Sequence, residues 1–397
     1  DSRKDDGWCC SMSEENKLLK EIMSGSPLRI TLSVLLGFVI GSIFMAVFNE
    51  NVVDTYATLF SNPGLTLQVA GQTIVDGYVA LFNGSIINLS ADNPVSMFRP
   101  ITETLRLGAP LIMAGLGVAL GFRVGLFNVG GTGQLVMGLL GATWISTRFE
   151  LPYGLHMILA LLVAVIFAAA TGGLVGFLKA RTGAHEVIVT IMLNYVAVDL
   201  FTFFLRTPSL LLEQGGGGNP KSDPPALTAQ FPRLLGESFG LNIGIILAIV
   251  AAVVYWWLME RSTIGYRFRM VGHNSNAARA AGISVERTYV WAMAASAAFI
   301  GLAAANQGLG ATSGLTSSIH ANIGFDAITV ALLGGSRAGG VVVAGLVFGA
   351  FKAGSPTMQI LGVSPEVLGI VQALIVLFIA APPLIRAIFK LPKAEVK

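Results

Sequence analysis

Apolar residues in this chain occur in long runs separated by short polar segments. Most runs approach the roughly 20 residues that an α-helix needs to cross a hydrocarbon core of about 30 Å. Lipid offers no hydrogen-bond partner to backbone N–H and C=O groups, so only helices or a closed barrel can span it, and the alternating pattern of a barrel is absent. We therefore predict an all-α polytopic membrane protein with about ten transmembrane helices, at residues 28–48, 100–121, 132–147, 155–178, 186–205, 241–258, 288–308, 323–335, 340–354 and 366–385.

The short runs leave the number of crossings open. Those at 132–147, 323–335 and 340–354 could each be a half-helix that enters and leaves on the same side. Losing one crossing would invert every later segment, so the distribution of basic residues becomes the deciding evidence.

The segments between and beside these runs complete the predicted organisation. A transmembrane domain at 28–385 follows a cytoplasmic N-terminal segment, 1–27, and precedes a basic cytoplasmic tail, 386–397. Two extracytoplasmic loops are expected. The first, 49–98, has room for an amphipathic interfacial segment at about 75–87. The second, 207–240, is rich in glycine and proline, and a linker or a docking role suits it equally.

Composition and charge support this arrangement. Hydrophobic residues make up 54% of the chain and charged residues only 12%, against about 25% charged in soluble domains. With both termini in the cytoplasm, basic residues gather on the inner side, as the positive-inside rule requires. These residues are Arg123, Lys179, Arg181, Arg337 and the arginines and lysines of 260–287 and 386–397. The net charge of +3 follows from this asymmetry and indicates no nucleic-acid partner.

The chain lacks the motifs of enzymatic chemistry. It has no phosphate-binding loop of the GxxxxGK type, no GxGxxG and no GxSxG. His185 and Glu186 begin like a zinc-protease motif, but Val189 stands where its second histidine would be. The four histidines are isolated, and the adjacent Cys9 and Cys10 are interpreted as free thiols. We expect neither a metal site nor catalysis by this chain.

Polar residues within the apolar runs are candidates for a solute pathway, because each requires a buried partner or a water-lined path. Glu186, Thr190 and Asn194 are spaced by four and share one helix face. That face could line a cavity. Equally, Thr190 and Asn194 could bond to neighbouring helices, with Glu186 lying near Lys179 or Arg181.

Two further groups of polar residues flank breaks in the predicted helices. Asn128 and Gln134 surround a glycine-rich segment where a broken backbone could offer amides to a solute, although a plain turn would also explain it. Asn306 closes the run at 288–308. Asp326 opens the next run, where an acid could also serve simply as a helix cap.

An arginine-rich polar segment, 260–287, separates two apolar runs and must face the cytoplasm. Its alanine-rich centre predicts a short helix offered to a soluble partner. An inner loop whose arginines merely anchor topology is the alternative.

Four motifs in order resemble the permease subunits of bacterial ABC importers of the ribose and branched-chain amino acid superfamily, most of all its purine-nucleoside branch, which works with basic-membrane-protein-type lipoproteins. The motifs are FRVGLFNVGGTGQLVMGLLGA (122–142), HEVIVTIMLNYVA (185–197), MVGHNSNAARAAGISVER (270–287) and GFDAITVALLGGSRAGGVVVAGLVFGAFKAG (324–354). One departure is Thr132, which stands where the family usually has an acidic residue.

The resemblance implies a type II importer fold in the bacterial cytoplasmic membrane. Its partners would be a second homologous permease, forming a heterodimer, two ATP-binding subunits that hold ATP and Mg, and an extracytoplasmic binding lipoprotein. The chain itself would carry no cofactor. Its function would be import of nucleosides or related ribosyl solutes. A sugar, riboflavin-like or amino acid solute is an alternative, as is an ion-driven secondary transporter.

The resemblance also assigns roles to residues. Residues 259–287, called the coupling segment from here on, would lie on the ATPase through Arg267, Arg269, Gly272, Asn274, Ala277, Arg279 and Gly282. Asn128, Gln134, Glu186 and Asn194 would line the solute path, with Asn306 and Asp326 nearer its mouth.

Overall fold

The computed structural model describes residues 26–213, 220–236, 238–311, 313–320, 322–380 and 388. Cys9 and Cys10, the glycine run at 215–218 and the basic tail apart from residue 388 lie outside these residues. Within the described part the chain is helical, with no strand beyond three isolated bridges. The all-α prediction is confirmed there.

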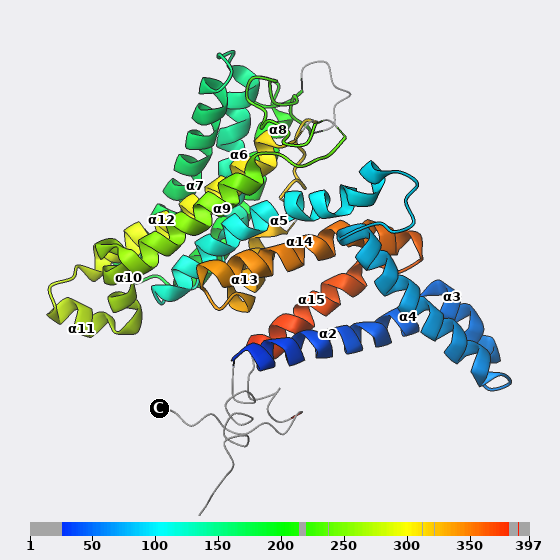
Figure 1. Ribbon diagram of the computed structural model, residues 1–397. Helices are drawn as coiled ribbons and strands as arrows, with labels where there is room; N and C mark the ends of the chain where they lie inside the picture. The colour runs from blue at the N-terminus through cyan, green and yellow to red at the C-terminus, as the bar shows by residue number, and fades with distance from the viewer. Residues whose placement is uncertain are drawn as a thin grey trace, which may run out of the picture. The chain divides into compact units, whose positions relative to one another are not determined.

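Seven of the described helices are long and apolar enough to cross a membrane (Figure 1). They are α2 (Ser26–Phe48), α5 (Pro94–Arg123), α7 (Leu155–Thr182), α8 (Glu186–Arg206), α9 (Gly244–Trp256) with its π-helical continuation η2 (Trp257–Arg261), α12 (Val285–Leu309) and α14 (Ala338–Ile360). The others are α3 (Glu50–Val53), the 3-10 helix η1 (Asp54–Thr58), α4 (Pro63–Ser85), α6 (Gly131–Arg148), α10 (Thr263–His273), α11 (Ser275–Ala280), α13 (Ile323–Leu333) and α15 (Pro365–Ala380).

Local sequence explains where several helices begin and end. Asn93 caps α5 by accepting from Ser96 N at 2.8 Å, and Pro94 supplies a first residue with a preset φ. The helix therefore starts six residues before the predicted 100. The segment 49–98 holds α3, η1 and the 23-residue α4. The predicted amphipathic segment at about 75–87 covers only the second half of α4. Gln68, Gln72 and Asp76 recur every four residues, so the helix has a polar face and forms no unbroken apolar run.

The described residues fall into two compact units, 26–74 with 366–380 and 388 in the first and those within 75–365 in the second. In the first, α2 packs on α15, since a Cβ at Gly37 would lie 2.5 Å from Ile375 Cγ1. In the second, α5 contacts α9, α12, α13 and α14. In its most apolar stretch 78% of α5 is buried, against 22% of α8, so α5 is the core helix of that unit and α8 lies at its edge.

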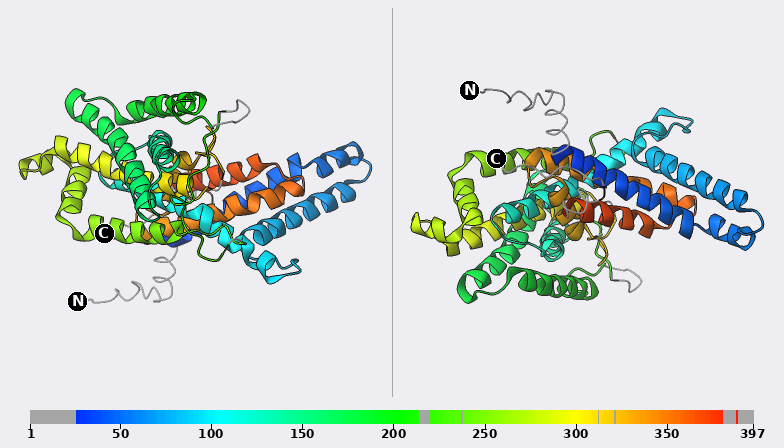
Figure 2. Two further views of the ribbon diagram at one scale, coloured as in Figure 1. Left: turned by 90° about the horizontal axis from the view of Figure 1, so that it is seen from above. Right: turned by 90° about the horizontal axis from the view of Figure 1, so that it is seen from below.

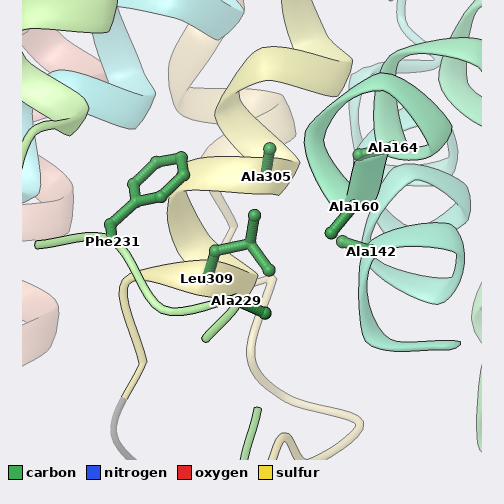
Figure 3. Close-up of a cluster of buried hydrophobic side chains, with 7 residues drawn as sticks. All are labelled: Ala142, Ala160, Ala164, Ala229, Phe231, Ala305 and Leu309. Carbon is green, nitrogen blue, oxygen red and sulfur yellow. The ribbon is translucent and has the colours of Figure 1, made fainter. Parts of the chain in front are cut away.

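Small residues allow α7 and α12 to pack backbone to backbone, because Gly172 and Gly176 are four residues apart and share one face of α7. A Cβ at Gly172 would contact Ala297 and lie 2.5 Å from Met293 O, and one at Gly176 would lie 2.7 Å from Val290 Cα. Figure 3 shows a second close contact rich in small residues, where α6, α7 and α12 meet the loop before α9. The cluster comprises Ala142, Ala160, Ala164, Ala229, Phe231, Ala305 and Leu309.

The coupling segment folds as η2, α10 and α11 and projects beyond the start of α12 (Figures 1 and 2). Ser262 caps α10 by accepting from Gly265 N at 2.9 Å. Asn274 caps α11 by accepting from Asn276 N and Ala277 N at 3.0 and 3.1 Å. A small apolar cluster of Val271, Ala278 and Val285 holds the two helices against α12. The short helix predicted in this segment is thus present.

The contact between α7 and α12 can be tested with adjacent glycines. Gly172→Leu should lower the free energy of unfolding by about 3 kcal/mol, because the side chain would be forced into α12. Gly173→Leu is the matched control, since a Cβ there meets only Ala294 Cβ, at 3.6 Å. Thermal unfolding of both variants in detergent makes the comparison; equal losses would contradict this packing.

Candidate functional site

The chain breaks its helical backbone between α5 and α6, at residues 124–130, inside the second unit. Gly125 permits the sharp exit from α5, because its φ of 75° is in the region that favours glycine. Leu126 N bonds back to Gly121 O at 2.9 Å, and α6 begins at Gly131 without a cap from its own N-cap residue. The remaining polar backbone groups of this turn need partners from elsewhere.

Asn128 organises the turn from within. Its Oδ1 accepts from Gly130 N at 3.0 Å and from Gln134 Nε2 at 3.1 Å, and its Nδ2 donates to Gln134 Oε1 at 2.9 Å. The same Nδ2 donates to Ser296 Oγ at 2.9 Å, and Ser296 Oγ donates to Gly117 O at 2.6 Å. This network joins the turn to α5, α6 and α12, and Asn128, Gln134 and Ser296 are all buried.

The buried face of α8 completes the support. Asn194 Nδ2 donates to Val129 O at 3.0 Å, while its Oδ1 accepts from Gly133 N at 2.7 Å and so caps α6 from a neighbouring helix. Glu186 Oε1 accepts from Phe127 N at 3.4 Å, and its Oε2 pairs with Lys179 Nζ at 2.6 Å. The partners expected for Glu186 and Asn194, a nearby lysine and neighbouring backbone, are therefore observed contacts. The expectation that Thr190 bonds to a neighbouring helix is wrong, since its hydroxyl donates to Glu186 O and Val187 O within α8 at 2.8 and 3.0 Å.

The starts of α6 and α13 touch beside this turn. A Cβ at Gly131 would lie 2.8 Å from Gly324 O, so the two backbones approach as only glycines allow. Thr132 lies at this contact, and its buried hydroxyl has no hydrogen-bond partner among the described residues. The departure from the family pattern thus falls where two helix N-termini meet.

The other two predicted pathway residues lie outside this network. Asp326 Oδ2 pairs with Lys352 Nζ at 2.7 Å, which connects α13 to α14 with both side chains partly exposed. Asn306, in the last turn of α12, packs against Gly244 at the start of α9. The structure therefore brings together Asn128, Gln134, Glu186 and Asn194, and leaves Asn306 and Asp326 at separate helix contacts.

The coupling segment has an exposed face and an inward face. Arg267, Asn274, Ala277, Arg279 and Gly282 are exposed, and Arg279 Nη2 pairs with Glu286 Oε1 at 2.5 Å on the surface. Arg269 turns inward and lies 3.8 Å from Glu260 Oε2.

Gly272 makes a close inward contact with α5 and the turn that follows it. A Cβ on it would strike Arg123 O and lie 2.9 Å from Val124 C, and Gly125 lies against the same glycine. The coupling segment thus touches the end of α5 and the turn that Asn128 organises.

Sequence reasoning named Lys179 as a partner for Glu186, but it missed Ser296 and Glu260 as members of these networks. Ser296 could have been found by its position, since a serine in the middle of an apolar run requires a hydrogen-bond partner. Glu260 was visible as the acid at the start of an arginine-rich segment. Among the described residues no group of three or more His, Cys, Asp or Glu side chains could hold a metal ion.

Comparison with known proteins places the chain among transport subunits. A family model described as branched-chain amino acid transport system / permease component matches residues 100–380. The chain is 40% identical over 328 residues to the guanosine ABC transporter permease protein NupP of Bacillus subtilis, covering 81% of this chain and 90% of that protein. It is 31% identical over 370 residues to the nucleoside ABC transporter permease protein NupB of Lactococcus lactis, covering 92% and 93%.

Two further relatives bear on partners and solutes. A second Bacillus subtilis protein, the guanosine ABC transporter permease protein NupQ, is 26% identical over 261 residues, covering 63% of this chain and 79% of that protein. The glucose ABC transporter permease protein TsgB13 of Haloferax volcanii is 30% identical over 366 residues, covering 89% and 86%. No solved structure matches the chain.

The network around Asn128 predicts that removing the Ser296 hydroxyl lowers the stability of the protein. Ser296→Ala should lower the free energy of unfolding by about 1–3 kcal/mol, because it leaves the Asn128 amide and the Gly117 carbonyl buried with one partner fewer. Ser355→Ala is the control, since that hydroxyl accepts only an exposed 3.3 Å bond from Gln359. Denaturant unfolding in detergent compares them; a Ser296→Ala variant as stable as the control would refute the network.

Proposed function

Because the chain belongs to the permease-component family of branched-chain amino acid transport systems, we propose that it imports nucleosides or related ribosyl solutes as a membrane subunit of an ABC importer. The observation that carries the solute class is the likeness to the guanosine permease over most of both chains. The nucleoside permease of Lactococcus lactis supports it. The relatives are ABC permeases, so ATP hydrolysis belongs to partner subunits, and this chain is a multi-pass membrane protein without catalysis of its own.

The proposed topology has ten crossings in a bacterial cytoplasmic membrane, with both termini in the cytoplasm. The shorter α6, α13 and α15 are the crossings beyond the seven long helices. Contacts among basic helix ends support this orientation: Arg123, at the end of α5, pairs with Glu260, and Lys179, near the end of α7, stacks on Tyr289 at the start of α12. These ends therefore share one side, as the positive-inside rule requires of cytoplasmic ends.

The proposed assembly pairs this chain with a second, different permease. The similarity of the chain to both guanosine permeases of Bacillus subtilis, one much closer than the other, supports a heterodimer. Two ATP-binding subunits would hold ATP and Mg, and an extracytoplasmic lipoprotein would deliver the solute.

The proposed pathway runs beside the turn at 124–130. Asn128, Gln134, Glu186 and Asn194 spend most of their hydrogen bonds on protein groups. Their role is therefore to fix the wall of the pathway, and a solute would bind weakly and could leave. Asn306 and Asp326 are proposed nearer its mouth, where Asp326 is partly exposed.

A sugar is the second candidate solute. The glucose permease of Haloferax volcanii resembles the chain over most of its length, and a ribosyl group presents hydroxyls of the same chemistry. The nucleoside proposal and the sugar proposal differ in whether the solute must carry a nucleobase.

Uptake into liposomes tests the function. The chain, reconstituted with its partner subunits and binding protein, should take up labelled guanosine when ATP is supplied on the side of the membrane where the ATP-binding subunits lie. A protonophore should leave the rate of uptake unchanged. Excess unlabelled guanosine should compete and glucose should not. Uptake that persists without ATP but collapses with the proton gradient would overturn the proposal in favour of a secondary transporter.

Coupling to the ATPase is proposed through the exposed face of α10 and α11. Arg279→Glu should reduce solute-stimulated ATP hydrolysis several-fold, because it reverses a charge at the expected interface. Glu286→Gln is the matched control, since it breaks the same surface ion pair from its other side. ATPase activity in liposomes separates the two. Equal effects in both variants, or none in Arg279→Glu, would remove Arg279 from the interface.

A further inference from the structure

A polar cavity of about 520 Å³ lies where the end of α5, the α9–η2 junction and the start of α14 meet. Its volume is within the range of sites for small ligands. None of the residues that line it is among the residues proposed to line the solute path or to contact the ATPase. The lining residues are Arg123, Tyr255, Trp256, Glu260, Gly335, Ser336, Arg337, Ala338 and Gly339.

The cavity carries an excess of positive charge. Arg123 and Arg337 line it, and Arg269 lies just behind Glu260. Glu260 is the acid in the lining, and it pairs with Arg123 at 2.5 Å. One carboxylate therefore faces three guanidinium groups, and Arg337 forms no ion pair within 4.0 Å in the described part of the chain. An anion would restore the balance.

Backbone donors converge on the same space. The 23-residue α14 begins in the cavity at Ala338, and its N-cap residue, Arg337, makes no side-chain capping bond. The first N–H groups of such a helix lack partners within it and carry partial positive charge, which favours a phosphate. Tyr255 OH donates to Ser336 O at 2.8 Å and fixes the loop that leads into the helix.

One residue of the cavity lining is typical of a membrane interface. Trp256 is 47% exposed, and the Arg261 guanidinium lies 5.6 Å from the centre of its ring. Tryptophan is enriched at the level of lipid headgroups, and basic pockets between helix ends there bind anionic headgroups. A lipid would reach this cavity from the surrounding leaflet without passing through solution.

We propose that this cavity binds a phosphate-bearing anion, the headgroup of an anionic membrane lipid such as phosphatidylglycerol. Arg337 and Arg123 contact the phosphate, the N–H groups of Ala338 and Gly339 donate to its oxygens, and the acyl chains leave past Trp256. The assignment of the inner leaflet rests on the proposed orientation. The site itself does not depend on transport.

Gly339 supplies a sharp test. A Cβ built there meets no atom within 4 Å, and an acid in the first turn suits the helix dipole. Gly339→Asp should therefore fold normally while repelling the anion. Gly339→Ala is its matched control and should bind as the original chain does. Arg337→Gln should weaken binding about fivefold, the share of one basic residue at a lipid surface.

The full chain, purified with its partner subunits, would be titrated with dioctanoyl-phosphatidylglycerol, dioctanoyl-phosphatidylcholine and inorganic phosphate, using native mass spectrometry and the shift in unfolding temperature. We expect binding of phosphatidylglycerol alone, lost in Gly339→Asp and kept in Gly339→Ala. Phosphate binding as tight as phosphatidylglycerol would overturn the lipid as occupant. Equal binding of the two lipids, or a Gly339→Asp variant that binds normally, would overturn the site.

Discussion

Everything in the second unit depends on how the polar backbone of residues 124–130 is bonded. A chain that interrupts its helices inside an apolar bundle must satisfy the freed N–H and C=O groups with protein, because lipid cannot. Asn128 does this from within the turn, and Asn194 does it from α8. Since both amides use donor and acceptor together, the turn is fixed to four helices, α5, α6, α8 and α12.

The polar residues that support the turn can hold the backbone in place and also line the proposed solute path. A buried amide that is fully bonded within the protein has little affinity left for a passing solute, and weak binding is what a conduit requires. In the proposed pathway, the same bonds would hold the wall in place. A positioning role and the proposed role in transport are therefore compatible, and the chain is similar to nucleoside ABC transporter permeases over most of its length.

The sequence was informative where burial depends on periodicity. Each predicted apolar run coincides with a described helix, and the four-residue spacing of Glu186, Thr190 and Asn194 located one buried face. It was less informative where a partner is distant in the chain. Nothing near Asn128 indicates Ser296, 168 residues away, and α4 was obscured by polar residues on a helix of mixed character. The roles of the coupling residues rest on resemblance, because short exposed helices look alike in composition.

The contact of Gly272 with the end of α5 has a mechanical consequence. Flexible side chains between two moving parts would absorb small displacements, but here main chain abuts main chain, and Glu260 clamps Arg123 beside it. Under the proposed coupling role, a displacement of α10 would therefore press directly on the backbone at the end of α5, next to the Asn128 turn. No flexible side chain of the described residues lies at this contact to absorb the displacement.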